Sequence, residues 1–139
     1  MSTRVVELTK SLTKRPGAPQ HVLNEVLSRV CVTPPQDYLE FMLKSNGAEG
    51  FIGADGYLML YAVEQLEPCN KPYGLGTNGP GLIIFGSAGD STAYAFDIRE
   101  ESSGIVEIDA ISMELGPVRF LGQSYEEFLE SVSDGDSDR

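Results

Sequence analysis

Tryptophan is missing from this chain of 139 residues, and histidine occurs only once. His21 is therefore the only imidazole that could serve in a Ser–His or Cys–His catalytic pair. It stands at the start of a predicted amphipathic helix, where a surface or capping role suits it better than catalysis. Carboxylates are plentiful, but glycoside hydrolysis needs two of them at a defined separation, and nothing in the sequence builds a groove around such a pair. We expect a protein that is not an enzyme.

Cysteine is nearly as scarce. Cys31 and Cys69 are far apart in the sequence and give neither a disulfide framework nor a metal knuckle. A zinc site needs several nitrogen or sulfur ligands, whereas His21 and the two cysteines lie in separate segments. Residues 74–79 spell G-L-G-T-N-G, but a strand does not precede them and a helix does not follow, so they do not predict a dinucleotide site. We expect no metal, no cofactor and a reduced, cytoplasmic protein.

Long apolar runs are absent too. No stretch approaches the roughly 20 apolar residues that a membrane-spanning helix needs. The opening residues, M-S-T-R-V-V-E-L-T-K, carry scattered charges and lack the apolar region of a secretory signal. We therefore expect no membrane partner. A chain of this length can bury a core as a single domain, which we place at residues 20–132. An N-terminal extension at 1–19, which can form a short helix, precedes it, and an acidic, disordered tail at 133–139 follows.

Basic residues are few in the later part of the chain. Lys and Arg number 10 against 21 Asp and Glu, which gives a net charge of −11. Residues 1–44 carry six basic and four acidic side chains, whereas residues 45–139 carry four and seventeen. Phosphate backbones bind to basic surfaces, so nucleic acid is not an expected partner, while a basic protein would be attracted. The alternative is an acidic surface that serves only solubility.

What the chain does contain is a set of helix signals on both sides of a central region. Residues 19–30 repeat valine and leucine at helical spacing, and a second helix is predicted from about 35 to 45. The start of that second helix matches a capping box, with Thr33 as the N-cap, Pro34 at the first helical position and Gln36 at the third.

The ends of the helical segments carry signals of their own. Asn46 and Gly47 predict a left-handed turn after the second helix. A last helix is predicted after a second capping box, S-Y-E-E at 124–127. Its apolar stripe consists of Tyr125, Phe128, Leu129 and Val132.

Strand signals fill the middle of the chain, at 57–61, 82–85, 92–99, 105–111 and 118–121. Residues 47–56 and 69–80 are rich in glycine or proline and predict loops. Within 92–99, Tyr94 and Phe96 face one way, while the small residues Ala93 and Ala95 face the other with Asp97 and Arg99. The order predicts an α+β fold, with N-terminal helices and a C-terminal helix beside an antiparallel sheet of about 4–6 strands; a mixed sheet is the alternative.

Three motifs occur in a fixed order: P-P-Q-D-Y-L-E-F-M-L-K-S-N-G-A-E-G, then L-I-I-F-G-S-A-G-D-S-T-A-Y-A-F-D-I-R, and last S-Y-E-E-F-L-E-S-V. The first is a proline-started aromatic helix that ends in N-G, and the second contains a strand ending in F-G-S followed by Y-x-F-D. In this order and spacing they resemble the SUKH superfamily, which includes bacterial immunity proteins and fungal cell-wall-synthesis regulators. The resemblance covers about residues 20–132.

The resemblance implies a protein-binding module without a shared catalytic set. Many bacterial relatives look like antidotes that block a toxin, often a nuclease, and others look like regulatory scaffolds. Gly47, Gly86 and Asp97 match motif positions, where backbone geometry and turn support are the implied roles. Arg99 lies two residues from Asp97 on one strand face, so the two side chains are expected to form a structural ion pair.

The leading hypothesis is an immunity protein that neutralises a basic, nuclease-type toxin domain. The acidic residues of predicted loops and turns are the expected contact face: Glu49, Asp55, Asp90, Glu100 and Glu101. A regulatory or scaffold domain without a toxin partner is the second hypothesis. A small-ligand protein or enzyme that uses a groove at Ala93 and Ala95, with Asp97 and Arg99, is the third. The oligomeric state is left open.

Overall fold

The computed structural model of the chain describes residues 3–30, 32–53, 56–70, 81–89, 92–98, 104–109 and 119–134. Its helical segments are α1 (Thr3–Leu8), α2 (Gln20–Val30), α3 (Gln36–Lys44), the 3-10 turn η1 (Val63–Gln65), α4 (Leu66–Asn70) and α5 (Tyr125–Asp134). Its strands are β1 (Thr13–Lys14), β2 (Ala48–Ile52), β3 (Gly56–Leu60), β4 (Leu82–Ser87), β5 (Thr92–Asp97), β6 (Gly104–Asp109) and β7 (Arg119–Gly122).

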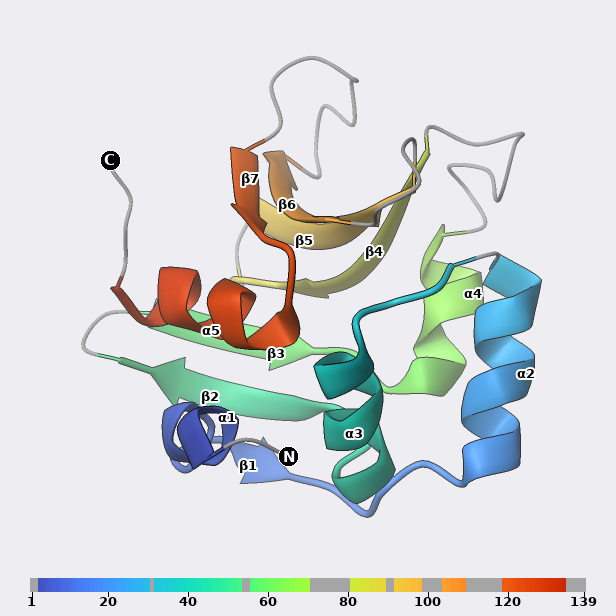
Figure 1. Cartoon of the computed structure of the whole chain (residues 1–139), viewed down its shortest axis with the longest axis horizontal. Helices are drawn as coiled ribbons and strands as arrows, with labels where there is room; N and C mark the ends of the chain where they lie inside the picture. The colour runs from blue at the N-terminus through green and yellow to red at the C-terminus, as the bar shows by residue number, and fades with distance from the viewer. Residues whose placement is uncertain are drawn as a thin grey trace.

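The strands form one seven-stranded sheet in the order β1-β2-β3-β4-β5-β6-β7. Every ladder is antiparallel. The short connections from β2 to β3, β4 to β5 and β5 to β6 require this pairing, whereas β1–β2 and β3–β4 are joined through helical segments. Figure 1 shows α3 and α5 against this sheet, with α2 and α4 side by side at one end. The predicted α+β fold is therefore confirmed, the mixed alternative is wrong, and the predicted strand count was too low.

The undercount comes from β1 and β2. The segment 47–56 contains four glycines and predicts a loop, yet β2 pairs with β3 along its whole length, from Ala48 opposite Leu60 to Ile52 opposite Gly56. Glycine propensity was misleading because cross-strand packing determines strand formation more than intrinsic preference does. Strand β1 has two residues, too few to show a period.

The main core lies between the sheet and the helices α3 and α5. The Tyr38 ring of α3 meets Phe85 and Phe96 edge-on, at 5.6 and 5.0 Å between ring centroids. Phe128 of α5 packs against Tyr94 at 4.9 Å. Edge-to-face contacts at such distances stabilise aromatic cores beyond the area that they bury. The same core takes in Val5 and Leu12, which precede residue 20.

The other face of the sheet carries a second apolar layer. Ala93 and Ala95 lie there at 2% and 0% exposure, with Leu82, Ile84, Val106 and Ile108. Tyr94 and Phe96 belong to the main core, so the predicted alternation of β5 is confirmed. Both alanines are buried, so they do not line an open groove of the kind that the third hypothesis needs.

The helices follow their predicted stripes, with one correction. The apolar stripe of α5 is buried as expected, and α2 buries Leu23, Val26, Leu27 and Val30. Helix α3 begins at Gln36, its N-cap is Pro35 with φ −57° and ψ 149°, and the cap makes no side-chain hydrogen bond. Thr33 is therefore not the N-cap. Pro35 disfavours the helical region for Pro34, so the chain stays extended for two further residues.

The second capping box is confirmed in part. Ser124 Oγ accepts the backbone N–H of Glu127 at 3.1 Å, while the Glu127 carboxylate accepts the N–H of Gln123 at 2.8 Å, one residue before the cap. Segment 69–80 was predicted as a loop, but α4 runs through Pro68 to Asn70. A proline in the first turn of a helix is tolerated because the N–H that it lacks has no partner there.

Several predicted features lie outside the described residues: Cys31, residues 71–80, residues 110–111 and the tail beyond residue 134. Within the described part of the chain, the helices are too short and too polar for any of them to span a bilayer.

Candidate partner-binding surfaces

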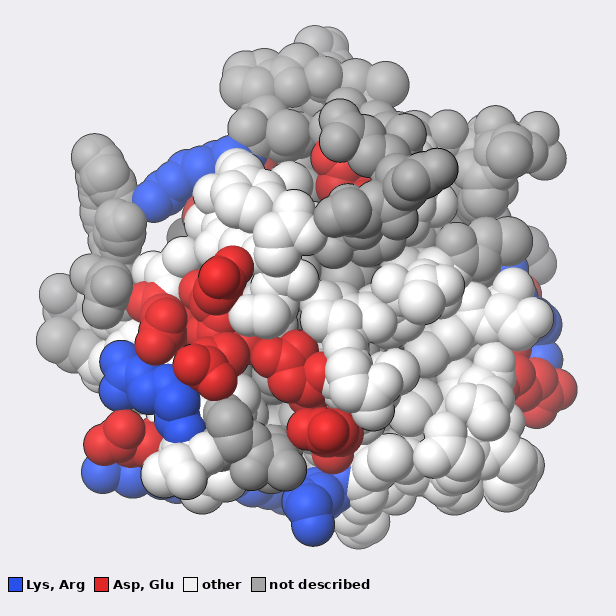
Figure 2. Space-filling view, in the orientation of Figure 1, with Lys and Arg blue, Asp and Glu red and all other residues white. Residues whose placement is uncertain are grey.

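Acidic side chains gather on two neighbouring helices. Figure 2 shows carboxylates over α5 and α3, with a basic side chain at the edge of the group. The acidic residues of these helices with described side chains form the set that we call the α3/α5 acidic face: Asp37, Glu40, Glu126, Glu127 and Glu130. Glu127 is exposed and the other four are half-buried, so all five carry part of their side chain at the surface.

The two helices are joined by a cap that crosses between them. The Asp37 carboxylate of α3 accepts the backbone N–H of Tyr125 at 2.9 Å and that of Glu126 at 3.0 Å. These N–H groups belong to the first turn of α5, which has no partners for them within the helix. The negative charge also lies at the positive end of the α5 dipole. Asp37 therefore holds the carboxylates of α5 in a set position relative to those of α3.

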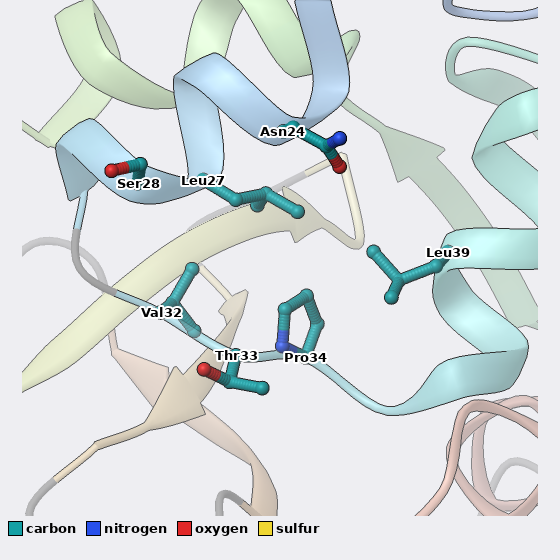
Figure 3. A pocket seen from close by; sticks show the side chains of 7 residues that line it. All are labelled: Asn24, Leu27, Ser28, Val32, Thr33, Pro34 and Leu39. Carbon is teal, nitrogen blue, oxygen red and sulfur yellow. The ribbon is translucent and has the colours of Figure 1, made fainter. Parts of the chain in front are cut away.

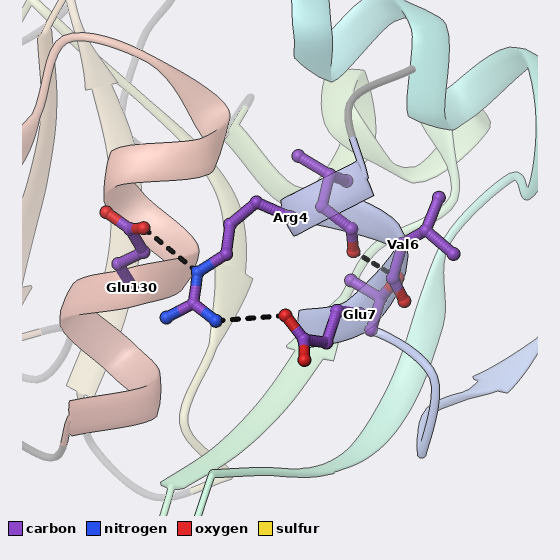
Figure 4. Close-up of polar contacts among 6 residues, drawn as sticks. Arg4, Val6, Glu7 and Glu130 are labelled. Atoms are coloured by element: carbon purple, nitrogen blue, oxygen red, sulfur yellow. Dashed lines mark hydrogen bonds and ion pairs between the residues drawn. The ribbon is translucent and has the colours of Figure 1, made fainter.

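Arg4 of α1 lies at the edge of this face. Its Nε atom donates to Glu130 Oε2 at 3.0 Å, and its Nη1 atom donates to Glu7 Oε1 at 3.2 Å (Figure 4). The hydrogen bond to Glu130, and then that to Glu7, raise the pKa of the Arg4 guanidinium. The Arg4 and Glu130 side chains are 44% and 40% exposed, and ion pairs as exposed as this one add little stability.

A second surface lies on the outer side of β1–β3. Its residues line a depression of about 360 Å³ that we call the Phe51 face: Thr13, Arg15, Glu49, Gly50, Phe51 and Tyr57. Phe51 is 66% exposed and meets Tyr57 edge-on at 5.1 Å. Side chains alternate between the two faces of a strand, which is why Ala48 and Ile52 point into the core instead.

Glu49 has a set orientation on this face. The Tyr57 hydroxyl donates a hydrogen bond to Glu49 Oε2. That bond is the main reason why the pKa of Tyr57 is raised, since a carboxylate acceptor favours the protonated phenol. Glu49 is half-buried and so presents its charge from a fixed position.

A comparison with protein families matches residues 17–131 to the SMI1 / KNR4 family (SUKH-1). The chain belongs to this family. The match confirms the SUKH resemblance of the three sequence motifs. A comparison with curated proteins gave no match.

The glycines of the SUKH motifs stand where a side chain would not fit. Gly47 has φ +95°, and a Cβ atom there would lie 2.8 Å from the Leu60 carbonyl oxygen. A Cβ atom at Gly86 would lie 2.8 Å from the Met59 carbonyl oxygen. Asp97 ends β5 and is half-buried. Its expected ion-pair partner, Arg99, is outside the described residues.

The face predicted from the sequence is only partly within the described SUKH-1 domain. Glu49 lies on the Phe51 face, whereas Asp55, Asp90, Glu100 and Glu101 are outside the described residues, so that face stays a prediction. The α3/α5 acidic face was missed. Its signal was present in S-Y-E-E-F-L-E, where Glu126 and Glu130 are one helical turn apart and so share a face.

A third feature of the SUKH-1 domain is an uncharged hollow between α2 and the start of α3. It has a volume of about 350 Å³, and the residues that line it are Asn24, Leu27, Ser28, Val32, Thr33, Pro34 and Leu39 (Figure 3). Without a charged group it offers little to orient a ligand. Among the described residues, groups of three or more His, Cys, Asp or Glu side chains that could hold a metal ion do not occur.

Proposed function

We propose that this chain is a non-catalytic protein-binding domain, an immunity protein that neutralises a basic toxin domain of the nuclease type. Membership of the SUKH-1 family over residues 17–131 carries the proposal. Cys69, the cysteine that the structure describes, is consistent with a non-catalytic protein. It is half-buried, and burial raises the pKa of its thiol. A raised pKa disfavours the thiolate that a cysteine nucleophile needs.

The α3/α5 acidic face supports a basic partner. A nuclease must present positive charge to bind phosphate, and a carboxylate surface that occupies the same cleft competes with nucleic acid. Complementary charge also speeds the encounter between two proteins. The Asp37 hydrogen bonds to Tyr125 and Glu126 hold the two helices together, so the carboxylates are already arranged before binding.

The test is capture of a partner from lysates of the source cell and its close competitors, with elution by stepwise salt. The eluate is assayed for nuclease activity, and purified chain is added back to ask whether it inhibits that activity. The test variant is Glu40→Lys with Glu126→Lys, which reverses charge on both helices and leaves the Asp37 side chain and the Arg4–Glu130 pair in place. We expect association to slow by about tenfold or more at low salt.

The matched control is Glu25→Lys on α2, a helix that contributes no residue to the α3/α5 acidic face and lies apart from α5 in Figure 1. Glu25 is 63% exposed and pairs with Arg29, which keeps a second partner in Glu67. A captured basic nuclease that the chain inhibits, with slower binding by the double variant alone, supports the proposal. Partners that lack nuclease activity, or equal binding by the double variant and the control, would contradict it and favour the regulatory scaffold.

A further inference from the structure

The Phe51 face combines an aromatic surface with a carboxylate in a depression. A single exposed apolar side chain is ordinary on a protein surface, but Phe51 is accompanied by a second ring and an oriented carboxylate in the same depression. Phe51 is 66% exposed, while the residues beside it in β2 and β3, Ile52 and Leu58, are 1% and 0% exposed. The core is complete without Phe51, so its ring is available for binding.

The aromatic pair is arranged to accept a cation. Phe51 and Tyr57 stand at 76° to each other with centroids 5.1 Å apart. In such an edge-to-face pair one ring directs its edge at the face of the other, and the exposure of Phe51 leaves much of its ring accessible to a ligand. The face of an aromatic ring carries negative charge density and attracts guanidinium or ammonium groups.

Glu49 supplies the formal charge beside these rings. The Tyr57 hydroxyl holds its Oε2 atom, which fixes the carboxylate before any ligand arrives. A fixed carboxylate costs less conformational entropy on binding than a freely rotating one. The neighbouring carboxylate and rings match the two ways in which arginine is recognised, by hydrogen bonds in the plane of the guanidinium and by stacking on its face.

We propose that the Phe51 face seats one arginine side chain of the basic protein partner, with the guanidinium stacked on Phe51 and hydrogen-bonded to Glu49. The identity of the ligand as a partner's side chain rests on the proposed function, whereas the affinity for guanidinium does not. The net charge of −11 attracts cations to the molecule as a whole, while Glu49 supplies the negative charge within this depression.

Arg15 allows a test of whether the ligand of this face is a cation or an anion. It lines the same depression, is exposed, and is held by its backbone N–H, which donates to Ser45 Oγ at 3.0 Å. A cationic ligand is repelled by Arg15, and an anionic ligand would be attracted by it. Replacing Arg15 with glutamine therefore strengthens binding of a cation and weakens binding of an anion.

The experiment titrates the full chain, labelled with nitrogen-15, with acetyl-Gly-Arg-Gly-amide at millimolar concentrations. Acetyl-Gly-citrulline-Gly-amide is the neutral isostere, and acetyl-Gly-Glu-Gly-amide is the anionic control. We expect the arginine peptide to shift the backbone amides of Glu49, Phe51 and Tyr57, and the other two peptides to leave them unchanged.

Variants then locate the site. Glu49→Gln keeps an acceptor for the Tyr57 hydroxyl and should weaken the arginine peptide about tenfold. Phe51→Leu should weaken it about threefold because the ring is lost. Phe120→Leu, at a phenylalanine that is 58% exposed on β7, is the matched control and should have no effect. Arg15→Gln should strengthen binding about twofold.

Three results would overturn the site: no shift at the Phe51 face, equal binding of citrulline, or equal affinity in Glu49→Gln and the parent. These results leave the proposed function intact if a captured nuclease is still inhibited. A failed capture combined with specific arginine binding would instead refute the proposed function and keep the guanidinium site.

Discussion

Tyr38 and Tyr125 place two phenol groups at the centre of the core. Both residues are 0% exposed, their ring centroids are 5.7 Å apart, and neither hydroxyl hydrogen-bonds to a residue that the structure describes. Burial raises the pKa of both hydroxyls, and the charges of Tyr38 and Asp37 raise that of Tyr125 further. The rings contribute packing, while the hydroxyls lose their hydrogen bonds to water and gain none with described residues in exchange.

Removing these hydroxyls should therefore stabilise the protein. We expect Tyr38→Phe and Tyr125→Phe each to raise the free energy of unfolding by about 1 kcal/mol at neutral pH in urea denaturation. The pKa values are raised in the folded state, so stability is full below the unfolded-state pKa of about 10 and falls as the pH rises above it. The double variant should lose less stability than the parent above a pH of about 10.

The control is Tyr57→Phe, which removes a half-buried hydroxyl that is hydrogen-bonded to Glu49. Lower stability of Tyr38→Phe or Tyr125→Phe than of the parent at neutral pH would contradict the prediction.

At the scale of elements, the cap of α5 is shared between its own sequence and α3. Ser124 accepts the N–H of Glu127, and Asp37 accepts those of Tyr125 and Glu126. We expect Asp37→Ala to lower the free energy of unfolding by about 2 kcal/mol, at the upper end for a helix cap, since two N–H groups lose their acceptor. Glu40→Ala removes a carboxylate from the same helix without touching the cap, and urea denaturation of both variants compares them. Equal losses would show that Asp37 acts through charge alone.

Local patterns predicted the elements whose causes are local. The apolar stripes of α2 and α5 and the alternation of β5 follow from spacing alone, because each is repeated within one segment. Thr33 failed as a cap because Pro35 restricts the residue before it. The cap that α5 does use joins residues 37 and 125, which no pattern within a segment can show. Strand β2 likewise depends on its partner β3 and not on its own glycine-rich composition.

For the whole molecule, composition predicted the sign of the surface charge but not where it gathers. The α3/α5 acidic face exists because α3 and α5 pack side by side, and the Phe51 face exists because β1, β2 and β3 become neighbours. Glu49 was predicted as a contact residue from the sequence because it is acidic and lies in a predicted loop. Its partners Phe51 and Tyr57 were not, since their exposure depends on which face of the strands is buried.

Strands β3 and β4 are connected by a short ladder, which we call the β3–β4 joint. This ladder has two residue pairs, Met59 with Ser87 and Leu60 with Gly86, beside a register shift in β4 between Ile84 and Gly86. Helix α5 packs against both β3 and β7 and so spans the joint. The absence of a side chain at Gly86 lets the two backbones approach, because a Cβ atom would lie 2.8 Å from the Met59 carbonyl oxygen.

Gly86→Ala should therefore push β3 away from β4 and lower the free energy of unfolding by about 2–3 kcal/mol. Gly104→Ala is the matched control in the same sheet, because its Cβ would meet the ring of the exposed Phe120 at 2.9 Å, and that side chain can turn aside. Hydrogen exchange should show faster exchange in β1–β3 of Gly86→Ala, with β5 protected, because the smaller half of the sheet loses its attachment first. Uniform acceleration across all strands, or equal stability of the two variants, would mean that the joint is not the weak point of the fold.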